Sequence, residues 1–316
     1  MNDIRKEKIF NTLNRLSEKI NSNELIKKLS NLVKIDTAVV GGSIRDIILN
    51  KEIKDIDISI TLDFNVNLTL KNNIDKDIMF NQATLDHGSA LKYREKEVVE
   101  LIRVEKIKGA NSSSDLIDFD YHEYDNNAVN AIVSIISEIL NASDDYSVDC
   151  IFTNKILDRN IKISDTAYFN IGLCAVLKVT DKKSEFPIDV LITTDSVAEF
   201  INCFDFNLCK TYMVNNEGVA QIVKPLVFIK DCENMTITYS PRESVTEAKM
   251  SKSLMVRYPR LREKLSEYKL VADTSVVENK NIKEMIAHTI KVINLTKDLS
   301  NMKINTTNTI KKLKKI

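Results

Sequence analysis

The stretch TAVVGGSIRDIILNKEIKDIDISI, residues 37–60, decides the fold of this chain. It predicts a short buried strand, a glycine turn, a short helix with an apolar face and a second strand. Gly41 and Gly42 are two of the six glycines in the sequence. Without Cβ atoms they let the backbone approach a ligand closely. We expect the hydroxyl of Ser43 to cap the helix that follows.

The second strand alternates, so we expect Asp55 and Asp57 on one face and the isoleucines on the other. Carboxylates this close repel each other, and Mg²⁺, which prefers oxygen ligands, removes that conflict. Two such ions activate an attacking oxygen and stabilise a leaving one. The helix N-terminus and the guanidinium of Arg45 suit phosphate oxygens. The unit therefore predicts a triphosphate at its turn and metal ions on its second strand.

GGSIRDIILNKEIKDIDISI resembles the GGxxRDxxLxxxxxDxD signature of the polymerase-β-type nucleotidyltransferases, especially the tRNA CCA-adding and poly(A) polymerase branch. The resemblance implies an NTP substrate and two Mg²⁺ ions. It assigns the triphosphate to Gly41, Gly42, Ser43 and Arg45, with a structural role also open to Arg45, and the metal ions to Asp55 and Asp57. Either half of the motif alone also fits a simple turn before a solvated acidic strand.

The family needs a third carboxylate, for which the sequence offers two candidates. Asp189 lies in the apolar strand PIDVLITT, where an unpaired carboxylate is costly. FDFNLCK follows it and resembles uncharacterised nucleotidyltransferases of phages and large viruses, whose tails contain a helix like residues 260–269. Glu100 lies in HGSALKYREKEVVELIRV, which resembles a hairpin of the CCA-adding enzymes. We prefer Asp189 as the third catalytic and metal-binding residue, with Glu100 as the alternative.

Composition limits the remaining possibilities. Lys plus Arg (45) balances Asp plus Glu (45), so no overall basic field points to nucleic acid. Five cysteines without CxxC spacing predict reduced core residues of a cytosolic protein. The three histidines lack the spacing of a zinc site, and no apolar run is long enough for a membrane span. We expect a cytoplasmic protein, in the host cytoplasm if a phage encodes it.

The predicted fold class is α+β, a nucleotidyltransferase core with a mixed β-sheet and flanking helices. We expect N-terminal helices over 1–34, the catalytic core over 35–215 with an insertion at 63–145, and a mostly helical region over 216–316. The last region contains a basic cluster, which fits either a nucleic-acid backbone or a solvated helix face with interleaved acids. Its members are Lys249, Lys252, Arg257, Arg260, Arg262 and Lys264.

The sequence thus predicts Mg²⁺-dependent transfer of a nucleoside monophosphate from an NTP to a hydroxyl, with RNA, in particular the tRNA 3′ end, as the preferred acceptor. Two alternatives stay open: transfer to a protein or small molecule, as in a toxin or a phage–host conflict enzyme, and a degenerate non-catalytic nucleotide or RNA binder. The acceptor is not fixed by the resemblance. DDYSVDCIFTN stands where CCA-adding enzymes carry RRDFTxNA, and it lacks the arginine pair.

Overall fold

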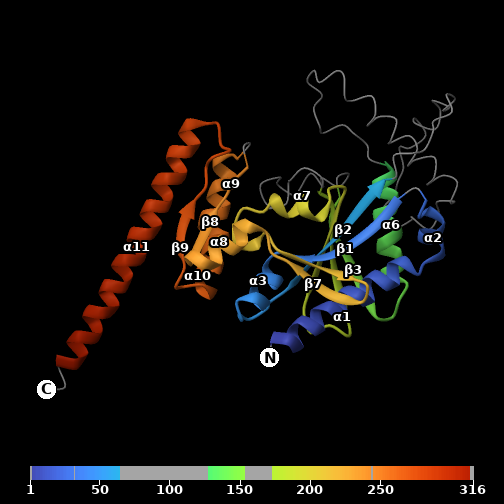
Figure 1. Ribbon diagram of the computed structural model, residues 1–316, viewed down its shortest axis with the longest axis horizontal. Coiled ribbons are helices and arrows are strands. Elements are labelled where there is room, and N and C mark those ends of the chain that lie inside the picture. Colours follow the sequence, from blue (N-terminus) through green and yellow to red (C-terminus); the bar gives the residue numbers. More distant parts are fainter. Residues whose placement is uncertain (1, 32, 65–126, 154–172, 243–244, 314–316) are drawn as a thin grey trace. The chain divides into compact units, whose positions relative to one another are not determined.

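The computed structural model describes residues 2–31, 33–64, 127–153, 173–242 and 245–313 (Figure 1). Glu100 and its hairpin lie outside these residues. The chain forms two compact units. The first, here called the sheet unit, comprises residues 1–201 and 212–223, and the second, the helical unit, comprises residues 202–211 and 224–316. The three segments expected from the sequence stay a prediction, since the contacts group the chain differently.

The sheet unit is built on a mixed seven-stranded sheet in the order β3-β4-β5-β2-β1-β6-β7, which confirms the predicted α+β class. The β2–β5 pair is parallel and every other neighbouring pair is antiparallel. The strands are β1 (Val33–Val40), β2 (Ile56–Phe64), β3 (Tyr146–Thr153), β4 (Leu173–Asp181), β5 (Ile188–Thr193), β6 (Tyr212–Asn216) and β7 (Val219–Val223).

One face of this sheet carries the hydrophobic core. Helix α1 (Asn2–Asn21) buries Leu13 and Leu16 at helical spacing, and α6 (Asn127–Asn141) buries Ile136. They pack in one cluster with alternate residues of β2, such as Ile58 and Ile60. Each such side chain contributes about 1.5–3 kcal/mol when buried. The short helices α2 (Glu24–Leu29), α3 (Gly42–Ile48) and α7 (Val197–Asn202) complete the helices described here.

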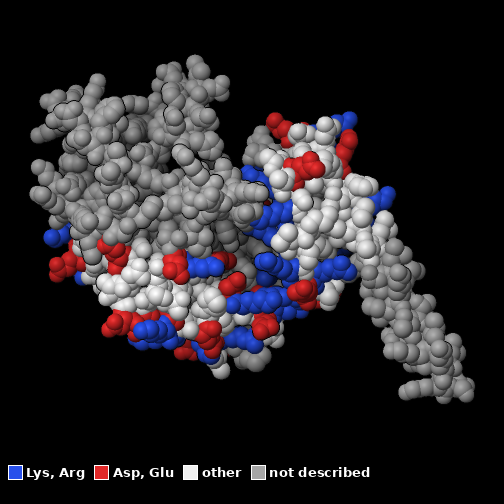
Figure 2. All heavy atoms as spheres, turned by 180° about the vertical axis from the view of Figure 1, so that it is seen from behind, with Lys and Arg blue, Asp and Glu red and all other residues white. Residues whose placement is uncertain are grey.

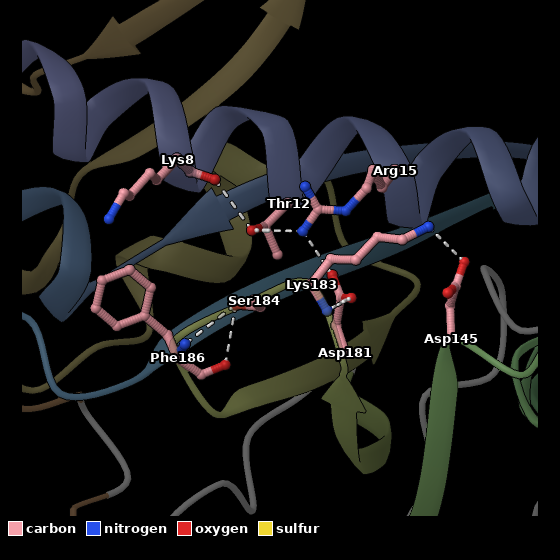
Figure 3. Close-up of polar contacts among 8 residues, drawn as sticks. All are labelled: Lys8, Thr12, Arg15, Asp145, Asp181, Lys183, Ser184 and Phe186. Atoms are coloured by element: carbon pink, nitrogen blue, oxygen red, sulfur yellow. Dashed lines mark hydrogen bonds and ion pairs between the residues drawn. The ribbon is translucent and has the colours of Figure 1, made fainter.

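A buried ion pair fastens α1 to the end of β4 (Figure 3). Nη2 of Arg15 donates to Oδ2 of Asp181 over 2.7 Å, and the backbone N–H of Lys183 donates to Oδ1 over 2.8 Å. The Asp181 side chain is only 1% exposed. A carboxylate is tolerated at such a site only when its oxygens are paired. Helix α1 is therefore an integral part of the sheet unit.

We expect Asp181→Ala to lower the free energy of unfolding by about 1–3 kcal/mol, because it leaves the half-buried guanidinium of Arg15 without its carboxylate partner. Glu185→Ala is the matched control. It breaks the exposed Lys8–Glu185 pair, which also joins α1 to the β4–β5 connection, and should cost less than about 1 kcal/mol. Urea unfolding followed by circular dichroism measures both. Equal losses would contradict the structural role of the buried pair.

The helical unit contains a two-stranded parallel sheet of β8 (Thr236–Tyr239) and β9 (Lys269–Ala272). Its helices are η3 (Asn207–Cys209), α8 (Leu226–Asn234), α9 (Glu247–Lys252), η4 (Ser253–Arg257), α10 (Tyr258–Lys264) and α11 (Lys280–Leu313). Within the residues described in the structure, no helix is long and apolar enough to cross a bilayer.

Two stretches of the chain depart from a single regular element. In FDFNLCKTYM, Phe206 forms only an isolated bridge with Tyr239, η3 follows, and a strand starts only at Tyr212. The backbone N–H of Lys210 donates to the carbonyl of Asn207, which turns the chain out of the extended conformation. In the helical unit, the π-helical turn η4, a wider turn often found near functional positions, separates α9 from α10.

Candidate active site

The glycine turn between β1 and α3 has the backbone conformation that it requires. Gly41 adopts φ 77° and ψ −133°, which a residue with a Cβ atom avoids. Helix α3 begins at once with Gly42. A Cβ atom added to Gly42 would lie 3.4 Å from Nη2 of Arg45, tighter than most such contacts. The turn thus has no Cβ atoms over its backbone where α3 begins.

Ser43 does not cap α3, contrary to the expectation from the sequence. The N-cap position is Gly41, which has no side-chain cap, and Ser43 lies inside the first turn. Its hydroxyl is buried and has no hydrogen-bond partner among the described residues. Buried hydroxyls normally have a partner, so one without any suits a polar ligand at this turn.

Arg45 is buried and holds Asp46 rather than pointing into solvent. Its Nε donates to Oδ1 of Asp46 over 2.8 Å, and its Nη2 lies 2.6 Å from the same oxygen. The exposed fractions of the two side chains are 6% and 3%. The guanidinium also lies beside Gly42. The geometry therefore favours the structural role that the resemblance allows for Arg45, in which its side chain packs against the glycine turn.

Asp57 and Asp189 are neighbours across the parallel β2–β5 pair, where they are direct register partners. Register partners point to the same side of a sheet, and this side is opposite the hydrophobic core. Burial raises the pKa of Asp189; the nearby Lys178 counters that rise, and the charge of Asp55 adds to it. This is the neighbourhood that the third-carboxylate hypothesis requires of Asp189.

The start of both strands is fixed by the backbone. The N–H of Ile56, one residue before Asp57, donates to the carbonyl of Pro187, two residues before Asp189, over 2.9 Å. Ile56 and Ile188 are both fully buried on the core face. A slip of one residue would turn these isoleucines outward and the aspartates into the core. The apolar alternation of the two strands therefore determines where the two carboxylates lie.

Asp55 lies outside the strand, which departs from the strict alternation expected from the sequence. Strand β2 begins at Ile56, and Asp55 ends an irregular, exposed segment before it. Its side chain is therefore not held by the sheet ladder. Within the described residues, no three His, Cys, Asp or Glu side chains converge closely enough to hold a metal ion. What the structure brings together is the Asp57–Asp189 pair, with Asp55 near enough to influence Asp189.

A cavity of about 390 Å³ opens on the same face of the sheet, towards the far end of β2. Its lining includes Thr61 and Asp63 of β2, Ala38 of β1 and Glu199 of α7. Glu199 is engaged locally, since its carboxylate accepts from the hydroxyl and N–H of Ser196. The cavity does not include Asp57 or the glycine turn, and sequence reasoning did not anticipate it.

The C-terminal basic cluster is divided by the fold. Arg257 pairs with Asp205 over 2.6 Å, and Ser253 donates to the same carboxylate oxygen over 2.6 Å. Asp205 is therefore a partner inside the helical unit. Lys249 and Arg260 are exposed. Elsewhere, over the described surface of the sheet unit in Figure 2, basic and acidic side chains are interleaved, as the neutral net charge suggests.

Comparison with known families gives the turn and the aspartates a context. Residues 37–144 match the family described as the poly(A) polymerase head domain. This part of the chain is therefore similar to the head domain of a nucleotidyltransferase of the polymerase-β type. The match begins in β1 and includes the glycine turn, α3 and β2, the part of the chain from which the sequence predicted this superfamily. No curated protein matches the chain.

The solved structures similar to this chain are distant. "Structure of tRNA-processing enzyme complex 3" is 11% identical with a TM-score of 0.37; the alignment covers 85% of this chain and 46% of that one. A tRNA nucleotidyltransferase complexed with a primer tRNA and an incoming ATP analog is 11% identical with a TM-score of 0.35, covering 82% and 47%. The chain thus spans about half the length of these neighbours, and at this similarity they do not identify an acceptor.

We expect Gly41→Ala to lower the free energy of unfolding by about 1–2 kcal/mol, the cost of a left-handed backbone for an L-residue. It should also weaken NTP binding about tenfold or more by moving the backbone N–H groups at the turn. Gly218→Ala is the control: Gly218 also has a positive φ, 85°, but lies in the open β6–β7 turn. Calorimetric titration with NTP should separate the two. An unchanged NTP affinity in Gly41→Ala would leave the glycine a purely structural role.

Proposed function

We propose that this nucleotidyltransferase transfers a nucleoside monophosphate from an NTP to a 3′ hydroxyl of RNA, with the tRNA 3′ end as the preferred acceptor. One observation carries the proposal. The register of β2 and β5 sets Asp57 beside Asp189, and Asp57 pairs on its other side with Val40, the last residue before the glycine turn. A carboxylate pair and a phosphate-binding turn are thus adjacent on one sheet.

The chemistry of these residues fits the substrate. The N–H groups at the start of α3 and the hydroxyl of Ser43 would bind the triphosphate. Asp57, Asp189 and Asp55 would hold Mg²⁺, whose preference is for carboxylate and phosphate oxygens; when bound, the metal supplies charge stabilisation for the transferring phosphoryl group. The exposed loop position of Asp55 lets it adjust to such a site.

The proposed reaction is a displacement at phosphorus. The acceptor oxygen forms a bond to the α-phosphorus, and the bond from that phosphorus to the oxygen bridging the α- and β-phosphates breaks, which releases pyrophosphate. Asp189 takes the proton of the acceptor hydroxyl.

RNA is favoured as acceptor because the matched family is the poly(A) polymerase head. Transfer to a protein or a small molecule is the second candidate, since the interleaved surface charges do not single out nucleic acid. Incubation of the full chain with each α-labelled NTP, Mg²⁺ and either total RNA or cell lysate decides between them. Labelled RNA supports the proposal. Label found only in protein or small molecules, or no label at all, would overturn it.

We expect Asp57→Asn and Asp189→Asn each to abolish transfer without loss of the fold. Because burial raises the pKa of Asp189 in the folded state, this group opposes folding once the pH rises above its unfolded pKa. Asp189→Asn should therefore keep or raise the Tm at neutral pH. Asp63→Asn, on the same face at the exposed end of β2, is the control and should retain transfer.

Transfer assays with labelled NTP and thermal unfolding at neutral pH measure these variants together. Full activity in either the Asp57 or the Asp189 variant would be incompatible with the proposed site. A clear fall in the Tm of Asp189→Asn would instead mean that this carboxylate is a structural group.

A further inference from the structure

The row of register partners that contains the two aspartates continues by one strand to a lysine. Asp189 of β5 pairs with Lys178 of β4, and Lys178 pairs in turn with Asp149 of β3. All of these side chains point to the face opposite the core. With strands about 4.8 Å apart, Lys178 begins about 10 Å from Asp57. The proposed phosphate turn, the two carboxylates and the lysine are thus arranged in that order across the sheet.

Lys178 is exposed, and neither a hydrogen bond nor an ion pair within 4 Å is found for it in the described part of the chain. The described strands of the seven-stranded sheet contain one other lysine, Lys34, and no arginine. Lys34 is at the far end of β1 and pairs with Asp36 over 2.6 Å. Among the described strands, Lys178 is therefore the cation of this sheet that lies beside the aspartate pair, where its charge acts on Asp189 without an ion pair within 4 Å.

The position of Lys178 indicates which substrate it faces. In phosphoryl transfer the attacking and leaving oxygens lie roughly in line on opposite sides of the phosphorus. The glycine turn, where pyrophosphate leaves in the proposed reaction, follows β1 on one side of Asp57. Lys178 lies on the other side, beyond Asp189. The acceptor must approach from that other side. A flexible ammonium group there suits an anion next to the attacking hydroxyl.

We propose that Lys178 binds a backbone phosphate of the acceptor, next to the hydroxyl that attacks, and so makes this site selective for nucleic-acid acceptors. This inference rests on the proposed function and deepens it by assigning the acceptor side of the site. A neutral hydroxyl, as on a protein side chain or a sugar, brings no phosphate for the lysine to bind. Lys178 also opposes the burial-driven rise in the pKa of Asp189, which agrees with its closeness to the carboxylate pair.

The test uses the full chain, an in vitro transcribed tRNA with a free 3′ hydroxyl, and α-labelled NTP. Lys178→Gln should raise the KM for the tRNA roughly tenfold, the loss expected for one charge-assisted contact. The KM for NTP should stay within about twofold. The log–log salt dependence of tRNA binding should become shallower by about 0.7–0.9, the value for one lost phosphate contact. Lys178→Arg should restore most of the tRNA affinity.

Lys182→Gln is the matched control. Lys182 is also an exposed lysine, but it follows the end of β4 and lies outside the row of register partners that contains the aspartates. This variant should change neither the KM for tRNA nor the salt slope. A rise in the KM for NTP instead of that for tRNA in Lys178→Gln would overturn the inference, as would an unchanged salt slope or an equal effect in Lys182→Gln.

Fluorescence anisotropy of labelled tRNA without NTP separates this inference from the proposed function. If wild-type protein transfers no nucleotide but Lys178→Gln still weakens tRNA binding with a shallower salt slope, the reaction is wrong and the acceptor contact stands. If transfer to RNA occurs and Lys178→Gln binds tRNA as wild type does, the reaction stands and the contact is wrong. Label found only in protein, with unaltered labelling by the variant, would reject both.

Discussion

The sheet unit depends on one interaction, the parallel pairing of β2 with β5. All the other strand pairs of this sheet are antiparallel, and this single parallel pair joins the stretch before the undescribed residues 65–126 to a strand much later in the chain. Buried isoleucines on its core face fix the register. The same register sets two carboxylates side by side on the other face, at a cost in repulsion and burial. The pairing that fixes the core residues on one face of the sheet therefore also positions the candidate site on the other face.

Much of this arrangement could be predicted from the sequence, because local patterns encode it. The glycine pair and the alternating aspartates lie close together in the chain, and both strand periodicity and turn chemistry are readable there. The strand around Asp189 was predicted from its apolar run, and its position beside Asp57 from the third carboxylate that the family resemblance requires. The apolar sequence of α6 is equally typical of a buried helix.

Other features depend on contacts that no local pattern contains. The inward turn of Arg45 towards Asp46 is a packing result, since the same residue beside a glycine turn fits a phosphate equally well. The π-helical turn and the short bridge at Phe206 arise from pairing within the helical unit. Lys178 carried no motif, and only the register of β4 against β5 shows that it neighbours the aspartates.

The division of the chain into units bears on how the protein is made. Both units are discontinuous in sequence: the polypeptide leaves the sheet unit after residue 201, returns at 212 and leaves again after 223. Synthesis runs from the N-terminus, so β1 exists long before β6, the strand that pairs with its outer edge. Until then, the backbone of Ala38, Val39 and Val40 is an open edge, the kind of surface that pairs with other chains. A fragment ending at residue 201 would keep that edge permanently, whereas one ending at residue 223 would retain β6 and cover it.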